Sequence, residues 1–167
     1  MNERAGYRAY LATRPVRGVV TPQRVQNLVV RDYATRNGLP YLMNVSEFAM
    51  SGCYMMLENA LSELDRTLGI IAFSAFMLPP EEDRRRRIYR RVLDAGASLH
   101  AALENLSVRT PADIQGFEDV ICTALLLDRT PFRGRYEKAE RSLAERDERF
   151  SRAILSASTP SVVAETM

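Results

Sequence analysis

The sequence predicts an α/β fold, a three-layer sandwich built around a small parallel sheet. Two observations support this prediction. Apolar segments rich in β-forming residues alternate with amphipathic helical segments, and each connection between successive strands is long enough to hold a helix. Connections of that length join parallel strands, and such crossovers are right-handed. We therefore expect about four strands in the order 2-1-3-4, with helices on both faces.

Four segments have the composition of strands, at residues 6–12, 39–45, 68–76 and 98–103. The third is almost entirely apolar, which is typical of a parallel strand that is covered on both faces. The second begins beside Pro40, and the first residue of a strand tolerates a proline.

The helices are expected between these strands. Thr21 and Pro22 are suited to the N-cap and the first helical position of the first helix. Apolar residues recur at helical spacing from Met50 to Leu64, which predicts the second helix. Acidic residues after Pro79 favour the start of the third helix, and Thr110 begins the fourth in the same way as Thr21.

Length and composition predict one main domain with a charged extension. The chain has 167 residues, of which 46% are hydrophobic and 26% are charged, and its net charge is +2. We expect an α/β domain over residues 1–132, a charged oligomerising helix over 133–159 and a disordered tail over 160–167. A weak apolar stripe in the helical segment is formed by Tyr136, Ala139, Leu143, Phe150 and Ile154.

The same composition argues against several classes of protein. A near-neutral chain lacks the basic face on which nonspecific nucleic-acid binding depends, so we expect no nucleic-acid partner. Neither a membrane-spanning run nor a signal-peptide core is present, so we expect no membrane partner and a cytoplasmic protein. With one histidine and two cysteines, we expect no metal site and no cofactor.

Catalytic residues are expected where the parallel strands end, because open α/β sheets bind ligands beyond their carboxyl edge. Glu47 and Glu104 follow two of the predicted strands, and Ser74 lies near the end of a third. One glutamate would remove a proton, and the other, with a pKa raised by burial, would deliver one.

Other polar residues near the same edge are expected to bind the substrate. Arg14 and the start of the first helix are suited to an anion such as a phosphate. The complete set of predicted binding residues is Arg8, Thr13, Arg14, Gln23, Gln26, Asn27, Asn44 and Tyr54.

Each catalytic candidate has a structural alternative. Glu47 could cap the second helix, Ser74 could allow close helix packing, and Glu104 could form a salt bridge with an arginine. Four consecutive arginines from Arg84 to Arg87 are interpreted as a solvated helix face. His100 lies inside a strand and is interpreted as a core histidine. No glycine-rich phosphate loop, dinucleotide-binding fingerprint or nucleophile elbow occurs in the sequence.

Several segments together resemble the family of sporadic carbohydrate cluster proteins: GYRAYLATRP, PQRVQNLVVRDYATRNGL, CYMMLENALSEL, GIIAFSAFMLP, RIYRRVLDAGASLHAALENLSV and ADIQ. They cover about residues 6 to 127. This resemblance implies a carbohydrate or sugar-nucleotide substrate without implying a reaction.

The layout is also similar to the catalytic domain of serine resolvases, where GYRAYLATR takes the place of the first strand and GIIAFSAFMLP that of the third. The activity is not expected. The Asp-Arg-…-Arg pattern after the third strand is missing, Thr13 is the hydroxyl nearest to the place of the nucleophilic serine, and no helix-turn-helix follows. Tyr10-Leu11-Ala12 is similar to the first strand of nucleoside deoxyribosyltransferases, which use a glutamate nucleophile.

These observations predict a cofactor-independent acid–base enzyme. Its substrate would be a sugar, a sugar nucleotide or a nucleoside, and its reaction a dehydration or isomerisation in carbohydrate or natural-product biosynthesis. We expect a small-molecule ligand of this class and a homo-oligomer. One alternative is a glycosidic-bond transferase or hydrolase with a glutamate nucleophile. The other is a non-catalytic resolvase-like assembly module.

Overall fold

The structure is a computed structural model that describes residues 4–129. By its internal contacts the chain divides into two units, Met1–Cys122 and Thr123–Met167, and the sheet belongs to the first. The predicted helix at 133–159 and the predicted tail at 160–167 lie outside the described residues. Within the described part of the chain, no helix is both long and apolar enough to cross a membrane.

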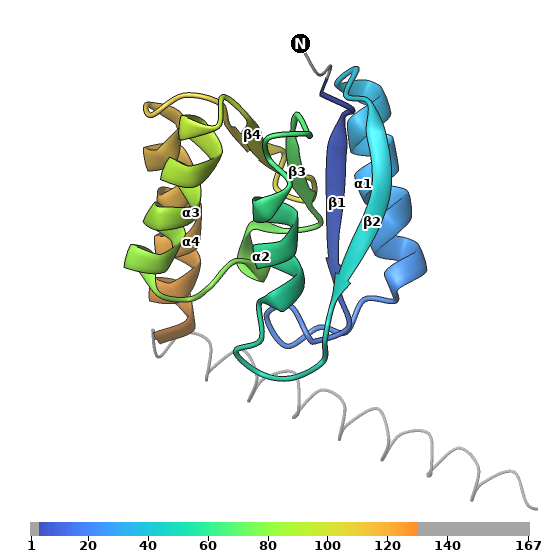
Figure 1. Ribbon diagram of the computed structural model, residues 1–167. Coiled ribbons are helices and arrows are strands. Elements are labelled where there is room, and N and C mark those ends of the chain that lie inside the picture. The colour runs from blue at the N-terminus through green and yellow to red at the C-terminus, as the bar shows by residue number, and fades with distance from the viewer. Residues whose placement is uncertain (1–3, 130–167) are drawn as a thin grey trace, which may run out of the picture. The chain divides into compact units, whose positions relative to one another are not determined.

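The sheet has five strands in the order β2-β1-β3-β4-β5 (Figure 1). Four of them are parallel: β1 (Tyr7–Ala12), β2 (Tyr41–Glu47), β3 (Gly69–Ala72) and β4 (Ser98–Ala101). The predicted α/β class and the order 2-1-3-4 are therefore confirmed. The fifth strand, β5 (Leu106–Val108), runs antiparallel to β4 and was not predicted.

Helices cover both faces of this sheet. The helix α1 (Gln23–Arg36) lies on one face, and α2 (Met55–Ser62) and α3 (Glu82–Asp94) lie together on the other (Figure 1). A short 3₁₀ helix, η1 (Ala75–Met77), follows β3, and α4 (Asp113–Arg129) follows β5. The right-handed crossovers account for this arrangement, because the chain reverses its direction across the sheet after β2.

The core lies on both sides of the central strands. Every residue of β3 and β4 is buried, as expected for strands covered on both faces. Large side chains that are less than 2% exposed fill the two interfaces between sheet and helices: Tyr10, Leu11, Leu57, Ile70, Ile71, Tyr89 and Leu99.

Three predicted element boundaries are wrong. The helix α1 begins after Pro22 and receives no side-chain cap; the carbonyl of Thr21 instead accepts a hydrogen bond from Gln26. The helix α2 begins at Met55 rather than Met50, after a turn in which Gly52 has a φ of 71°. Strand β3 ends at Ala72, because the following residues turn into η1.

The arginine run on α3 is not a uniformly solvated face. Arg85 is 2% exposed, and its guanidinium donates to both oxygens of Glu118 on α4, at 2.8 and 2.6 Å. It also donates to the carbonyls of Pro79 and Pro80, and Tyr89 donates to Glu118 at 2.6 Å. The ion pair is buried but fully hydrogen-bonded, which offsets the cost of removing two charges from water.

Glycine is required where β3 begins, because Gly69 has a φ of +149° and an added Cβ would overlap the carbonyl oxygen of Ser98 on β4. We expect Gly69→Ala to lower the free energy of unfolding by about 2 kcal/mol or more. Urea unfolding measures the change. Gly116→Ala in α4 is the control: the added methyl meets no neighbour within 4 Å, so it should stabilise by about 0.5–1 kcal/mol. Equal effects of the two substitutions would contradict the prediction.

Candidate functional site

At the carboxyl ends of β1 and β2, polar side chains form one hydrogen-bonded group, called here the Glu47 cluster: Tyr10, Arg14, Glu47 and Cys53. Glu47 is the last residue of β2, pairs with Ala12 of β1 in the sheet, and is only 1% exposed. Regular strand pairing places its side chain between the sheet and the start of α2.

The Glu47 carboxylate accepts hydrogen bonds from both neighbouring elements. The backbone N–H groups of Met56 and Leu57, in the first turn of α2, donate to it at 3.1 and 3.2 Å. The Tyr10 hydroxyl donates at 3.1 Å, and the Phe48 N–H also donates. Glu47 therefore caps α2, since it satisfies N–H groups that have no partner within the helix.

These hydrogen bonds decide the ionisation of the carboxyl group. Burial acts to raise the pKa of Glu47, but the N–H groups of Leu57, Met56 and Phe48, together with the Tyr10 hydroxyl, outweigh it, so the pKa is lowered. Burial, reinforced by the charge of Glu47 and opposed by that of Arg14, raises the pKa of Tyr10. Glu47 is thus an anion and Tyr10 a neutral donor near neutral pH.

Arg14 closes the same end of the sheet. Its guanidinium donates to the carbonyl of Cys53 at 2.6 Å and to that of Met77 at 2.9 Å. It also lies over the ring of Tyr54, 4.5 Å from the ring centroid, and Arg84 of α3 lies 4.6 Å from the same centroid. The cation predicted to hold an anion is therefore bound to main-chain carbonyls and an aromatic ring.

Glu104 belongs to a second group, called here the Glu104 cluster: Ser74, Ala75 and Glu104. The Ser74 hydroxyl donates to one carboxylate oxygen of Glu104 at 2.6 Å, and the Ala75 N–H donates to the other at 2.9 Å. Ser74 is 0% exposed and also caps η1 by accepting from the Phe76 N–H. Among the described residues, Glu104 thus binds the turn after β3 rather than an arginine.

The two predicted glutamates belong to different hydrogen-bonded groups. Among the described residues, no side-chain hydrogen bond joins the Glu47 cluster to the Glu104 cluster. One of the two glutamates was expected to have a raised pKa, and the pKa of Glu47 is instead lowered. The physical reason is that the buried Glu47 carboxylate accepts hydrogen bonds from backbone N–H groups and from the Tyr10 hydroxyl. The position of a glutamate at the end of a strand does not reveal these donors.

Two predicted binding residues support the loop after β1. The side-chain amide of Gln26, 1% exposed, accepts from the N–H of Ala12 and donates to the carbonyls of Ala12 and Thr21. Thr13 donates to the carbonyl of Glu47 at 3.3 Å, and Gln23 is the first residue of α1. Gln26 therefore fixes both ends of this loop instead of facing a ligand.

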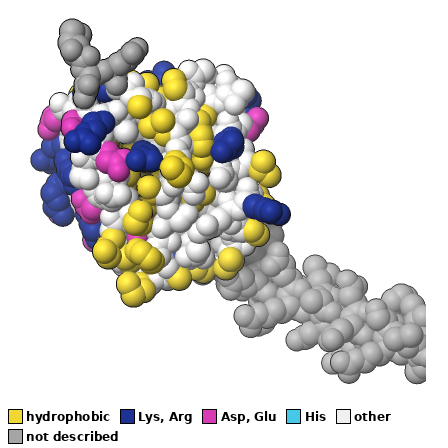
Figure 2. Space-filling view, turned by 45° about the vertical axis from the view of Figure 1, so that its right-hand side comes forward, with side chains coloured by type: hydrophobic (Ala, Val, Ile, Leu, Met, Phe, Trp, Pro, Cys, Tyr) yellow, Lys and Arg dark blue, Asp and Glu magenta, His cyan; other side chains and the backbone are white. Residues whose placement is uncertain are grey.

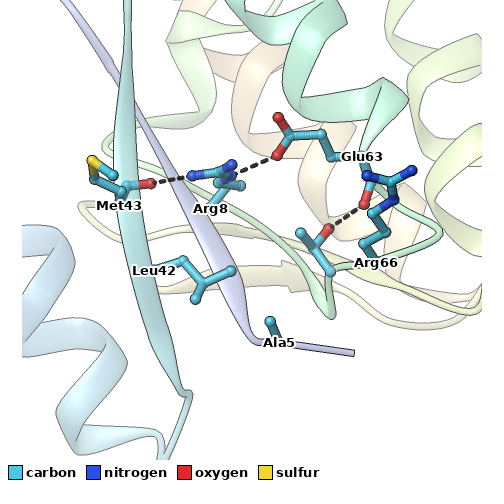
Figure 3. A pocket seen from close by; sticks show the side chains of 7 residues that line it. Ala5, Arg8, Leu42, Met43, Glu63 and Arg66 are labelled. Carbon is cyan, nitrogen blue, oxygen red and sulfur yellow. Dashed lines mark hydrogen bonds and ion pairs between the residues drawn. The ribbon is translucent and has the colours of Figure 1, made fainter. Parts of the chain in front are cut away.

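The remaining predicted binding residues lie elsewhere. Arg8 faces a surface pocket of about 440 Å³ beside α2, where it donates to Glu63 at 2.6 Å and contacts the carbonyl of Met43 (Figure 3). Asn27 accepts from Arg31 and Tyr41 on the α1 side of the sheet, and Asn44 donates to Ser46 on the edge strand β2. These residues do not meet the two strand-end clusters.

Sequence reasoning missed Tyr10 as a member of the Glu47 cluster and assigned His100 to the core without its partners. Tyr10 is 0% exposed and is followed by Leu11 and Ala12, so the pattern indicates packing and hides the hydroxyl. His100 is also 0% exposed and bonds to Tyr33 and Ser98. Only Ser98 and His100 share a strand, and no spacing in the sequence brings Tyr33 to His100 or Tyr10 to Glu47.

Comparison with known proteins gives a distant likeness in structure only. No protein-family model matches the chain, and no curated protein matches it. The resemblance to sporadic carbohydrate cluster proteins therefore gains no support. Two solved structures are similar: a resolvase-family site-specific recombinase from Streptococcus pneumoniae and the N-terminal catalytic domain of TP901-1 integrase.

The recombinase is 13% identical over 83% of this chain and 99% of that chain, with a TM-score of 0.49. The integrase domain is 11% identical over 73% of this chain and 96% of that chain, with a TM-score of 0.44.

The predicted sugar enzyme is contradicted. The similar structures are by name a recombinase and an integrase rather than carbohydrate enzymes. The associated expectations of a biosynthetic dehydratase or isomerase and of a sugar or nucleoside ligand are withdrawn with it. The expectation that nucleic acid is excluded as a partner is contradicted as well, because the similar structures are by name a site-specific recombinase and an integrase.

The lowered pKa of Glu47 gives a pH-dependent prediction. A carboxyl group whose pKa is lower in the folded state stabilises the fold above its unfolded pKa, and that stabilisation is lost as pH falls through the folded pKa. We expect Glu47→Gln to cost about 2 kcal/mol at neutral pH and progressively less toward about pH 3, measured by urea unfolding.

Glu82→Gln is the matched control, since Glu82 forms an exposed pair with Arg86 one helical turn away. Its cost should be about 0.5 kcal/mol or less. If the two substitutions cost the same at neutral pH, Glu47 does not hold the strand end together.

Proposed function

We propose that this chain is a non-catalytic assembly module, a resolvase-like α/β domain that joins copies of the same chain. The observation that carries the proposal is the closure of the carboxyl edge of the sheet. Open α/β sheets bind substrates at this edge, and here its polar groups are committed to bonds within the fold.

Closure of the edge removes the groups that a reaction would need. Glu47 is 1% exposed and Ser74 is 0% exposed. Arg14 donates to main-chain carbonyls of Cys53 and Met77, and breaking those bonds would leave carbonyls without partners. A catalytic group must lie within hydrogen-bond reach of a substrate, which these side chains do not offer.

Exposed apolar side chains surround the closed edge, and we call them the apolar rim. They come from the loops that follow β1 and β2, which are neighbouring parallel strands, and from the first residue of α2. Between 51% and 65% of each side chain is exposed: Val19, Val20, Phe48, Met50 and Met55. Yellow apolar side chains gather on the lower part of the face in Figure 2.

The β1 loop holds its part of the rim in a defined conformation. Val16 and Val19 form an antiparallel bridge with N···O distances of 2.9 and 3.0 Å. Arg17 and Gly18, with φ values of 50° and 81°, make the turn between them, and Arg17 lies over the Phe76 ring. A rim held in this way loses little conformational entropy on binding.

A protein surface is the partner that such a rim fits. Exposed apolar clusters mark interaction sites, and methionine adapts to irregular apolar surfaces. A second copy of the chain is favoured because residues 133–159 combine an apolar stripe with many arginines and glutamates. That segment is therefore complementary in charge to another copy of itself.

Polar substitutions in the rim should weaken self-association. We expect the full-length Phe48→Ser/Met50→Ser double variant to associate about tenfold more weakly than the parent chain, because exposed anchors in an interface lose apolar burial. Sedimentation equilibrium gives the constants. The control is Val25→Ser/Leu28→Ser on α1, where both side chains are exposed but lie outside the rim. A double variant that associates as strongly as the parent would show that the rim does not bind.

Removing residues 134–167 should also reduce the mass in solution. We expect the full chain to be oligomeric and the truncated chain to be monomeric at the same concentration, by light scattering coupled to size exclusion. Circular dichroism of the truncated chain checks that the α/β unit is retained. A monomeric full-length chain would overturn the proposal, and an unchanged oligomer after truncation would assign assembly to the rim alone.

A further inference from the structure

Four side chains form a continuous hydrogen-bonded row at the amino edge of the sheet, opposite the clusters described above. The Tyr33 hydroxyl contacts His100 Nδ1 at 2.9 Å, His100 Nε2 contacts Ser98 Oγ at 2.9 Å, and Ser98 Oγ contacts the Tyr7 hydroxyl at 2.9 Å. Tyr7 and Ser98 are the first residues of β1 and β4. The row thus runs from the buried face of α1 to the open edge of the sheet.

Only one direction of the row satisfies all of its buried protons. Burial, aided by the charge of Arg109, lowers the pKa of His100 to about 4, so the ring carries one N–H near neutral pH. The buried Tyr33 hydroxyl has His100 as its acceptor in the described part of the chain. A buried hydroxyl without an acceptor is costly, so Tyr33 donates to Nδ1 and the ring proton resides on Nε2.

The remaining protons follow from that assignment. His100 Nε2–H donates to Ser98 Oγ, and Ser98 donates to the oxygen of Tyr7. The Tyr7 hydroxyl proton is then the one that the row leaves without an internal acceptor. Successive donors polarise one another, which makes this terminal hydroxyl a stronger donor than an isolated tyrosine.

The Tyr7 hydroxyl belongs to the lining of a surface pocket of about 350 Å³. Asn37, Ser98 and Arg109 also line it, and none of the described lining residues is acidic. Arg4 adds a second cation beside the pocket, because its guanidinium donates to the carbonyl of Gly96 at 3.0 Å. The Arg109 guanidinium makes no ion pair with the described residues.

We propose that this amino-edge pocket binds a small oxyanion, a phosphate or a carboxylate, with Arg109 supplying the charge and the Tyr7 hydroxyl a directed hydrogen bond. Guanidinium and hydroxyl donors are the groups that recognise oxyanions in proteins. The buried part of the row holds Tyr7 in place, so the site is formed before the ligand arrives. This site is independent of the assembly function proposed above.

Titration of the full-length protein with inorganic phosphate and, separately, with acetate tests the proposal by NMR, with sodium chloride at matched ionic strength as the reference. We expect saturable shifts of the Tyr7, Ser98 and Arg109 amides with at least one anion. Saturation by phosphate alone identifies a phosphate site, and saturation by acetate alone identifies a carboxylate site. Shifts no larger than those in chloride would overturn the proposal.

Two variants distinguish specific anion binding in the pocket from a general attraction of anions to basic side chains. Arg109→Gln, at an exposed position, should weaken binding about tenfold, and Tyr7→Phe should weaken it less. The controls are Arg36→Gln, which removes an exposed arginine of α1, and Tyr41→Phe, which removes a hydroxyl bonded to Asn27. Equal weakening by Arg109→Gln and Arg36→Gln would overturn the proposal.

The protonation of the histidine ring is an independent test. Long-range ¹H–¹⁵N correlation of the His100 ring should show the proton on Nε2. A proton on Nδ1 would reverse the row, direct the Ser98 proton back toward the ring, and remove the reason for a directed Tyr7 donor. That result would overturn the proposal even if an anion bound nearby.

Discussion

The carboxylate of Glu47 is the point at which the first half of the fold is held together. It accepts from a hydroxyl on β1 and from two N–H groups at the start of α2, while its own backbone ends β2. A buried charge without such donors would cost several kcal/mol. With them, one side chain fixes the end of a strand, the start of a helix and the separation between two layers.

The two edges of the sheet differ in which polar groups remain free to contact solvent or a ligand. Both carboxylates satisfy turns or helix starts, and the arginine that accompanies them is bonded to main-chain carbonyls. At the amino edge, a neutral histidine relays hydrogen bonds outward to a hydroxyl beside an exposed guanidinium. The polar groups of the carboxyl edge therefore stabilise the fold, whereas those of the amino edge end at groups that contact solvent.

The alternation of elements was predictable because it depends on local patterns. The apolar run that contains β3 records burial directly, since all four residues of this strand are buried. The short strand β5 was not predictable in this way, since its three residues have no repeat and follow a turn at Asn105 with a φ of 54°. The end of β1 at Ala12 was located correctly, whereas the end of β3 was placed too late. Glu47 and Glu104 look alike in sequence and differ in the donors that meet them.

Those donors belong to other elements of the fold. The sequence therefore indicated which polar residues lie at the carboxyl edge but not which groups they bind. Met56 lies nine residues after Glu47, and Ala75 lies twenty-nine residues before Glu104. Gln26 is polar and lies near the carboxyl edge, as a binding residue would, yet its amide bonds to the backbone of Ala12 and Thr21. Polar character in sequence indicates that a partner exists without indicating whether that partner is a ligand or the protein itself.

The buried pair of Arg85 and Glu118 has a consequence for how the sequence can change over time. Loss of either residue alone strands a charge among apolar side chains, whereas exchange of both for well-packed apolar residues can be neutral. Single mutations at these two positions are therefore selected against, although the pair as a whole is replaceable. Related chains should keep both residues or neither, and the contact between α3 and α4 should be visible as correlated substitution.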